Sequence, residues 1–401
     1  MSFLIKKYLF IFLFNFLIAN IPNNENKSIV ILVSFDGFRY DYTNLIDTPN
    51  FDYISNNGTR STSLQPIFPS FTFPNHYTIA TGCYADNHGI LGNTFYDYSK
   101  NKEYSYTNPQ TVRDGSWYGC EPIWVTAEKE GLVSATYFWV GSEAKINNFY
   151  PTYYKNYKNG IDPIDKIKQV IDWLSYPKNK RPRLITLYFN EPDYSGHVYG
   201  PIHSKTIAQI EYADSLLGYL INSVSKLDIA NQVNFIIVSD HGMVEVSNSR
   251  VINLDDYLDF EYDYYGRGPY IEINGIPNNI NYRLPEIPNV TIYSRENFPD
   301  RFHFKTENLG EYLLLADSGW LLYTNDYIKE GELTVKGMHG YDPYYMNMHG
   351  IFYAYGPKFK KGLIINTFES IHIYPLICEI LNIKSNDDID GNIDVLKAIL
   401  K

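Results

Sequence analysis

Three apolar runs rich in β-branched residues each end in an aspartate, and this pattern constrains the fold more than any other feature of the chain. The runs cover 28–36, 184–193 and 233–240. Continuous apolar runs of this length predict strands that are buried on both faces of a parallel sheet. Ligands of such sheets bind beyond the carboxyl ends of the strands, so the three aspartates are expected to line one cleft.

Histidines follow two of these aspartates closely. His197 lies four residues after Asp193, His241 comes directly after Asp240, and Asp36 supplies the third carboxylate. Carboxylates gathered in one cleft repel one another strongly unless a cation lies between them. The pattern therefore predicts a metalloenzyme.

Length and charge narrow the function classes. The chain has 401 residues, enough for one large α/β domain with insertions or for two domains. Its net charge of −11 argues against binding a nucleic-acid duplex through the backbone phosphates. A small anionic substrate is compatible with this negative charge, because bound metal ions reverse the local electrostatic field. Three cysteines are too few for a disulfide scaffold, and at least one must be unpaired.

The first twenty residues predict a secretory signal peptide. Lys6 and Lys7 precede an apolar stretch over 8–18, and Ala19 and Asn20 follow it. The stretch is shorter than the ~20 residues that span a membrane, so we expect cleavage and no stable membrane anchor. The sequence predicts a secreted or periplasmic protein, and the low cysteine content favours the periplasm.

Strand-like and helical patterns alternate from residue 28 to about 245, as in a doubly wound α/β sheet. Helices are expected over 163–174, with Asp162 as N-cap, and over 204–227. Residues 252–335 loosen into a Tyr-, Pro- and Asn-rich region, which we interpret as an insertion or cap on the same core. Within it we expect short strands at 270–273, 313–316 and 320–323, and the core resumes with a strand at 351–355 and a helix over 370–381. Residues 27–401 are expected to form a single catalytic domain.

Thr72 lies where a helix should begin. Pro74 suits the first turn of that helix and Gly82 suits its end. Backbone N–H groups at a helix N-terminus favour an anion, so Thr72 is a candidate functional residue. On this segment alone, a role for Thr72 as the helix N-cap is the simpler interpretation.

Seven short segments together resemble the nucleotide pyrophosphatase/phosphodiesterase family of the alkaline phosphatase superfamily. In chain order they are DGFR (36–39), TFPNHY (72–77), NHGI (87–90), EPIW (121–124), EPDYSGHVYGP (191–201), SDHGM (239–243) and GMHG (337–340). The resemblance extends from residue 28 to about 385. It implies an alkaline-phosphatase-like sheet that is mostly parallel and flanked by helices, with a smaller inserted cap.

The resemblance also implies two zinc ions and a threonine nucleophile. Its metal ligands are Asp36, Thr72, Asp240 and His241 for one ion, and Asp193, His197 and His339 for the other. Thr72 would carry a phosphothreonine intermediate. Asn93 would contact the phosphoryl oxygen, although an asparagine after Gly92 also suits a plain turn. Phe73 and Tyr157 would stack on the base of a nucleotide, and an ordinary tyrosine is an equally good interpretation of Tyr157.

The implied function is a phosphodiesterase that cleaves nucleotide phosphodiester or pyrophosphate bonds and releases a nucleoside 5′-monophosphate. The main alternative is a glycerophosphocholine or lysophospholipid phosphodiesterase with the same two zinc ions, for which Glu143 and nearby tyrosines could supply a cage. Phosphomonoesterase activity and a catalytically inactive binding protein also stay open.

Phe71 replaces a lysine common in vertebrate relatives. His76, His88 and His349 are expected to be structural.

Overall fold

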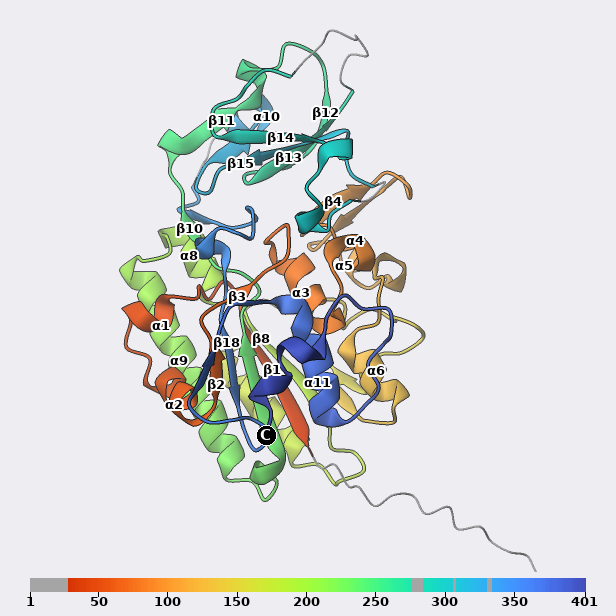
Figure 1. Ribbon diagram of the computed structural model, residues 1–401, viewed down its shortest axis with the longest axis vertical. Coiled ribbons are helices and arrows are strands. Elements are labelled where there is room, and N and C mark those ends of the chain that lie inside the picture. Colours follow the sequence, from red (N-terminus) through yellow and green to blue (C-terminus); the bar gives the residue numbers. More distant parts are fainter. Residues whose placement is uncertain (1–27, 276–283, 306–307, 330–333) are drawn as a thin grey trace, which may run out of the picture.

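The computed structural model describes residues 28–275, 284–305, 308–329 and 334–401, so the predicted signal peptide at 1–20 lies outside the described residues. An eight-stranded sheet forms the centre of the molecule (Figure 1). In spatial order its strands are β19 (Leu363–Ile365), β2 (Thr59–Ser61), β18 (Phe352–Tyr355), β9 (Val233–Val238), β1 (Ile29–Phe35), β8 (Leu184–Phe189), β6 (Ser134–Tyr137) and β7 (Tyr153–Tyr154).

The three runs that end in aspartates form neighbouring parallel strands. β1 pairs with β8 on one side and with β9 on the other, and β6 and β7 continue the parallel arrangement. β18 is antiparallel to both β9 and β2. The sheet is therefore mixed and mostly parallel, which confirms the predicted fold class.

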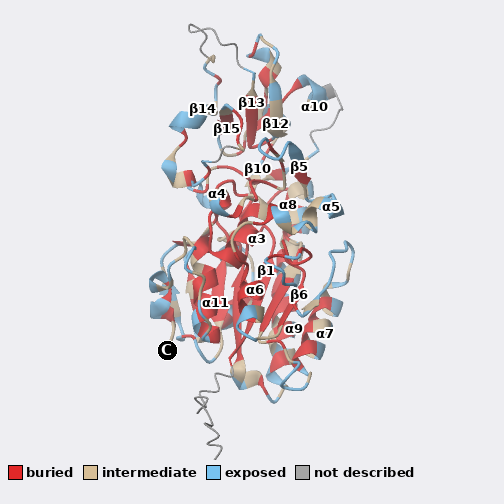
Figure 2. Ribbon diagram, turned by 90° about the vertical axis from the view of Figure 1, so that its right-hand side faces the viewer, coloured by how far each residue is buried: buried red, intermediate tan, exposed pale blue. Residues whose placement is uncertain are grey.

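Helices cover both faces of this sheet, and alternate residues of β1 enter two different cores. Val30 and Leu32 pack with α3, α6 and α11, whereas Ile31 and Val33 pack with α2, α7 and α9. Figure 2 shows α11 and α9 on opposite sides of the buried strands. Burial on both faces explains why β1 is apolar at every position except Ser34. The helices are α1 (Tyr42–Leu45), α2 (Pro49–Asn57), α3 (Thr72–Thr81), α4 (Ala85–His88), α5 (Pro109–Val112), α6 (Ile123–Lys129), α7 (Pro163–Leu174), α8 (Asp193–Tyr199), α9 (Ser204–Ser225), α10 (Asn325–Lys329) and α11 (Ile373–Leu381).

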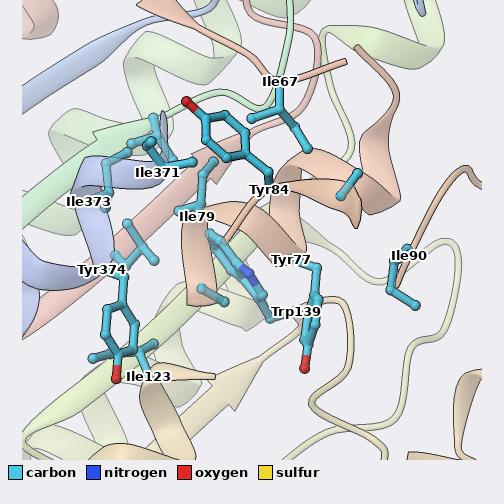
Figure 3. Packing of buried hydrophobic residues seen from close by; sticks show 14 of the residues in the cluster. Ile67, Tyr77, Ile79, Tyr84, Ile90, Ile123, Trp139, Ile371, Ile373 and Tyr374 are labelled. Atoms are coloured by element: carbon cyan, nitrogen blue, oxygen red, sulfur yellow. The ribbon is translucent and has the colours of Figure 1, made fainter. Parts of the chain in front are cut away.

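The predicted helix starts and ends match the structure closely. Asp162 accepts a hydrogen bond from the Ile164 N–H at 2.9 Å and Pro163 is the first residue of α7. α9 begins at Ser204 as expected and ends two residues before the predicted limit. α3 ends at Gly82, which has a left-handed φ of 71°. Around α3, residues such as Ile79, Trp139 and Tyr374 pack closely (Figure 3).

A second, antiparallel sheet of four strands lies within the predicted insertion at 252–335. Its strands, in order, are β12 (Asp263–Arg267), β13 (Tyr270–Asn274), β15 (Tyr312–Ala316) and β14 (Val290–Ser294). The part of the chain that the structure describes also holds four strand pairs: β4 (Thr94–Asp97) with β5 (Lys102–Ser105), β10 (Val244–Glu245) with β17 (Gly337–Met338), β11 (Val251–Asn253) with β16 (Leu321–Tyr323), and β3 (Leu64–Gln65) with β20 (Phe368–Glu369). The three strands expected within the insertion are thus present as β13, β15 and β16.

The inserted region packs on the main core through aromatic side chains. Phe68, which precedes α3, contacts the rings of Tyr270, Phe298, Phe302 and Phe304 with centroids 4.4–5.9 Å apart. These residues belong to the same apolar cluster as the helices on one face of the sheet. The insertion and the segment before Thr72 therefore share one packed interior.

Cys83 and Cys120 form a disulfide, and Cys378 is a buried free thiol. The disulfide joins the end of α3 to the segment before α6. Among the described residues, no helix combines the length and apolar character needed to cross a membrane.

Candidate metal centre

The aspartates at the ends of the three strands converge as predicted. Asp36 follows β1, Asp240 lies just after β9, and Asp193 begins α8 shortly after β8. The Asp193 N–H donates to the Asp36 carbonyl at 3.0 Å, and the Gly37 N–H donates to Oδ1 of Asp240 at 3.1 Å. Gly37 has a φ of 66°, and a Cβ at this position would lie 2.8 Å from Cα of Asp193. Only glycine lets these two segments approach so closely.

Asp36, Asp240 and His241 form one group whose ligand atoms lie close enough to share a metal ion. All three side chains are buried. Nε2 of His241 lies 3.4 Å from Oδ1 of Asp36 and 3.0 Å from Oδ2 of Asp240. The Thr72 hydroxyl lies 3.2 Å from the same Nε2. The structure thus brings the predicted threonine and three predicted ligands together.

Asp193, His197 and His339 form a second such group. Asp193 and His197 are one turn apart on α8, and His339 directly follows β17. Oδ1 of Asp193 lies 3.4 Å from Nε2 of His197 and 3.5 Å from Nε2 of His339. The rings of His241 and His339 stack with centroids 3.5 Å apart, so the two groups are adjacent.

The hydrogen bonds of the three histidines aim a lone pair of each ring into the centre. Nδ1 of His241, His197 and His339 lies 2.8–2.9 Å from the backbone carbonyls of Gly242, Gly337 and Ser70, respectively. A carbonyl only accepts, so each Nδ1 carries a proton, and in the neutral ring each Nε2 has a lone pair. Nε2 of His197 and Nε2 of His339 nevertheless lie 3.0 Å apart. Two lone pairs at this distance repel unless a cation lies between them, and such second-shell carbonyl contacts are typical of metal-binding histidines.

The carboxylates also require a cation between them. Oδ1 of Asp36, Oδ1 of Asp193 and Oδ2 of Asp240 are buried without a hydrogen-bond partner among the described residues. An unsatisfied buried charge is costly. Burial and the neighbouring carboxylates of Asp240 and Asp193 raise the pKa of Asp36 well above its usual range. Carboxylate oxygens and imidazole nitrogens are the ligands of catalytic zinc sites, so the residues present fit divalent metal ions.

The nucleophile candidate lies at the start of α3, but it does not cap the helix. The helix begins at Thr72, Phe71 occupies the N-cap position, and no side chain caps it. The N-cap interpretation of Thr72 is therefore wrong: the hydroxyl points to His241 instead. Phe71 packs edge-on to the ring of His339 with centroids 5.6 Å apart. Gly340 has a φ of 108°, and a Cβ there would lie 2.3 Å from the Phe71 ring, so the GMHG segment needs its second glycine.

Asn93 and Phe73 lie beside Thr72. Oδ1 of Asn93 accepts the Phe73 N–H at 2.8 Å, which leaves the Asn93 amide group as a donor. The Phe73 ring lies 5.7 Å from the ring of Tyr106, a half-exposed residue for which the sequence carries no functional signal. Tyr157 is 51% exposed, and its ring lies 5.1 Å from that of Phe138. Burial of part of this side chain, with the charges of Asp36 and Tyr106, raises the pKa of Tyr157.

The remaining histidines have internal partners, as expected of structural residues. His349 contacts the Ser63 hydroxyl at 2.9 Å and the Pro343 carbonyl at 2.8 Å. His88 contacts the Thr78 hydroxyl at 2.9 Å and accepts the Ile90 N–H at 3.1 Å, and burial lowers the pKa of His88 to about 3.

His76 is structural but lies close to the centre. Its Nε2 lies 2.8 Å from the Ser34 hydroxyl, and its Nδ1 lies 3.0 Å from the Thr72 carbonyl and 3.3 Å from Oδ2 of Asp240.

Sequence reasoning missed one residue at the centre, Tyr188. Its hydroxyl donates to Oδ2 of Asp36 at 2.6 Å. A tyrosine inside an otherwise apolar parallel strand is an available signal, because a buried hydroxyl needs a partner.

Comparison with known proteins identifies relatives of this chain. Residues 30–342 match the profile of a protein family described as "Type I phosphodiesterase / nucleotide pyrophosphatase". A venom phosphodiesterase of Naja atra is 37% identical over 381 residues, which cover 90% of this chain and 45% of that protein. Human ectonucleotide pyrophosphatase/phosphodiesterase family member 5 is 36% identical over 361 residues, which cover 88% of this chain and 74% of that protein. The chain thus spans about half the length of the venom relatives.

Solved structures agree with the sequence comparison. Murine ectonucleotide pyrophosphatase/phosphodiesterase 5, an inactive threonine-to-alanine variant in complex with AMP, superposes with a TM-score of 0.87 at 34% identity. The match covers 93% of this chain and all of that chain. The human counterpart superposes with the same TM-score at 33% identity.

Proposed function

Because the chain belongs to the type I phosphodiesterase/nucleotide pyrophosphatase family of the alkaline phosphatase superfamily, we propose that it is a zinc-dependent phosphodiesterase. It hydrolyses nucleotide phosphodiester or pyrophosphate bonds and releases a nucleoside 5′-monophosphate. The observation that carries this proposal is the position of the Thr72 hydroxyl, 3.2 Å from His241, at the edge of two adjacent Asp/His groups.

Two zinc ions fit the two groups. One would be held by Asp36, Asp240, His241 and Thr72, and the other by Asp193, His197 and His339. Bound zinc supplies Lewis acidity, which favours the ionised form of a hydroxyl and stabilises charge on phosphoryl oxygens. The orphaned carboxylate oxygens and the facing Nε2 atoms support this assignment.

The protein's own residues account for the covalent chemistry. The Thr72 oxygen forms a bond to phosphorus while the bond from phosphorus to the leaving alcohol or phosphate breaks. Water then attacks the phosphothreonine and the bond from phosphorus to the Thr72 oxygen breaks. The nucleoside 5′-monophosphate leaves, and the Thr72 hydroxyl is restored. We propose that the NH₂ group of Asn93 donates to a non-bridging phosphoryl oxygen, because the side-chain carbonyl of Asn93 already accepts the Phe73 N–H.

A nucleotide is favoured over a choline phosphodiester. The Glu143 carboxylate accepts from Arg113 Nε at 3.0 Å and from the Tyr157 N–H at 2.5 Å, so its charge is already engaged. Tyr150 and Tyr154 stack on each other with centroids 5.4 Å apart. Phe73 and Tyr157 are proposed to stack on the base, and the murine relative was solved with AMP.

The test compares p-nitrophenyl thymidine 5′-monophosphate with p-nitrophenylphosphorylcholine as substrates of the purified protein with zinc. We expect cleavage of the nucleotide ester, and at least a 10³-fold loss of turnover in Thr72→Ala while the variant still folds and holds zinc. Thr62→Ala is the control, because Thr62 is exposed and its hydroxyl contacts Thr367. Retained turnover in Thr72→Ala would refute the nucleophile. Cleavage of the choline ester alone would move the protein to the lipid-derived alternative.

We also propose that the protein is secreted or periplasmic and that residues 27–401 act as one domain. The disulfide of Cys83 and Cys120 supports export, because disulfides persist in oxidising compartments. The aromatic contacts around Phe68 support a single unit. Expression with the native N-terminus, followed by N-terminal sequencing of the exported protein, tests the predicted cleavage near residue 20.

A further inference from the structure

Tyr188 lies on β8 beside the candidate metal centre, and its hydroxyl contacts Asp36. We propose that Tyr188 is a positioning residue that determines which oxygen of Asp36 faces the metal on the Thr72 side of the centre. This inference rests on the proposed function, because it assigns a role within the same centre.

The two oxygens of Asp36 have different surroundings. Oδ2 accepts the Tyr188 hydroxyl at 2.6 Å, a short distance typical of a hydrogen bond to a charged acceptor. Oδ1 is buried without a hydrogen-bond partner among the described residues, and it lies 3.4 Å from Nε2 of His241. The hydroxyl thus occupies one oxygen and leaves the other for the metal.

The position of the Tyr188 hydroxyl is fixed by contacts around the whole residue. Tyr188 is opposite Ser34 in the register of β8 and β1, two residues before Asp36. Its carbonyl accepts a hydrogen bond from Nζ of Lys166 at 3.1 Å. Its ring packs edge-on to the ring of His76, with centroids 5.2 Å apart. Backbone and ring are therefore both constrained, and the hydroxyl can select one rotamer of Asp36.

Loss of this hydroxyl would act on one metal only. Without this hydroxyl, the Asp36 carboxylate can rotate or present both oxygens to the metal. The ligand geometry of the first group, Asp36, Asp240 and His241, is then less well defined. Removing a second-shell partner typically costs 10–100-fold in metal affinity or activity. Among the described residues, the Tyr188 hydroxyl bonds to Asp36 and not to Asp193, His197 or His339, so this second group should keep its affinity.

The experiment compares Tyr188→Phe with Tyr353→Phe in the purified protein loaded with zinc. Phenylalanine keeps the ring of Tyr188 and removes only the hydroxyl. Tyr353 is a buried tyrosine on β18 whose hydroxyl contacts the Thr43 hydroxyl at 3.0 Å, so it controls for the loss of an internal hydroxyl. Zinc per chain is measured against a graded chelator, together with kcat and KM for p-nitrophenyl thymidine 5′-monophosphate.

In Tyr188→Phe we expect one of the two zinc ions to bind about 10–100-fold more weakly, while the other is unchanged. The kcat should fall at limiting zinc and recover when zinc is added in excess, and KM should change less than about threefold because the ring stays. Tyr353→Phe should match the wild type. Recovery by zinc separates weakened metal binding from simple structural damage, which added metal would not repair.

Two results would overturn the inference. One is a Tyr188→Phe variant that holds both zinc ions as tightly as the wild type, which would leave the proposed phosphodiesterase intact. The other is an equal loss of zinc in Tyr188→Phe and Tyr353→Phe. If the wild type instead lacks phosphodiesterase activity while Tyr188→Phe still loosens one zinc, the proposed function fails and the positioning role of Tyr188 is supported.

Discussion

Asn75 connects the start of α3 to the segment before it, and its replacement by alanine tests how the nucleophile is held in place. The side chain is fully buried. Its Oδ1 accepts the Ile67 N–H at 2.7 Å, and its Nδ2 donates to the carbonyls of Pro69 and Phe71 at 3.0 and 2.9 Å. These contacts bind the segment that leads directly into Thr72.

The cost of Asn75→Ala follows from these three bonds. A buried N–H left without an acceptor costs about 1–3 kcal/mol, and each lost bond to a carbonyl about 0.5–1.5 kcal/mol. The sum is about 2–6 kcal/mol of unfolding free energy. A chain of 401 residues unfolds with an entropy of about 0.8 kcal/mol/K, so Tm should fall by roughly 2–7 °C. Because the segment loosens next to the hydroxyl, kcat should fall as well, and a displacement of about 1 Å is enough for a 10²-fold loss.

Calorimetry of the zinc-loaded protein measures this Tm, and the nucleotide ester assay measures kcat. Asn57→Ala is the matched control, because Asn57 is a partly exposed asparagine at the end of α2 whose Nδ2 donates to the Tyr53 carbonyl at 3.0 Å. Surface substitutions of this kind change stability by less than about 0.5 kcal/mol. A Tm for Asn75→Ala no lower than that of Asn57→Ala would refute the view that these bonds hold the segment.

Three further predictions concern the base, the metals and pH. Phe73→Ala should raise KM for a nucleotide ester far more than for a simple aryl phosphodiester, since base stacking is worth about 1–3 kcal/mol; equal effects on both substrates would exclude a stacking role. Asp193→Asn should lose one zinc and most activity, and elemental analysis that still finds two zinc ions per chain would contradict the assignment. Burial raises the pKa of Glu272 to about 7, so the folded state keeps a proton that the unfolded chain releases, and stability should fall as pH rises from about 4.5 to 7. Glu272→Gln should remove this dependence and be more stable than the wild type at pH 8 by up to about 3 kcal/mol, as measured by chemical denaturation at pH 5 and pH 8.

The convergence of Asp36, Asp193 and Asp240 could be predicted because it follows from the residue pattern within each strand. Burial on both faces favours apolar residues along most of each strand, and the aspartate that follows such a run marks the carboxyl end of the strand. The limits of α3 were predicted for a similar reason, since proline has a fixed φ that suits the first turn and glycine readily adopts the left-handed φ at a helix end, whatever surrounds them.

The contacts that the sequence did not predict depend on neighbours distant in the chain. The bond from Tyr188 to Asp36 depends on the register of two strands more than 150 residues apart. The pairing of Cys83 with Cys120, and the contact of Thr72 with His241 in place of an N-cap, depend on where α3 lies in the fold. No periodic pattern encodes such distances.

The centre described above draws on residues from 36 to 339, and this spacing has a consequence for biosynthesis. A ribosome that has released β1, β8 and β9 has already exposed the carboxylates of Asp36, Asp193 and Asp240, yet His339 is still to be made. During that interval the second group has two of its three members, and the lone pair of His197 has no opposing imidazole. We therefore expect the second group to acquire its metal ion only after His339 has been synthesised, whereas the members of the first group are all present once residue 241 has been made.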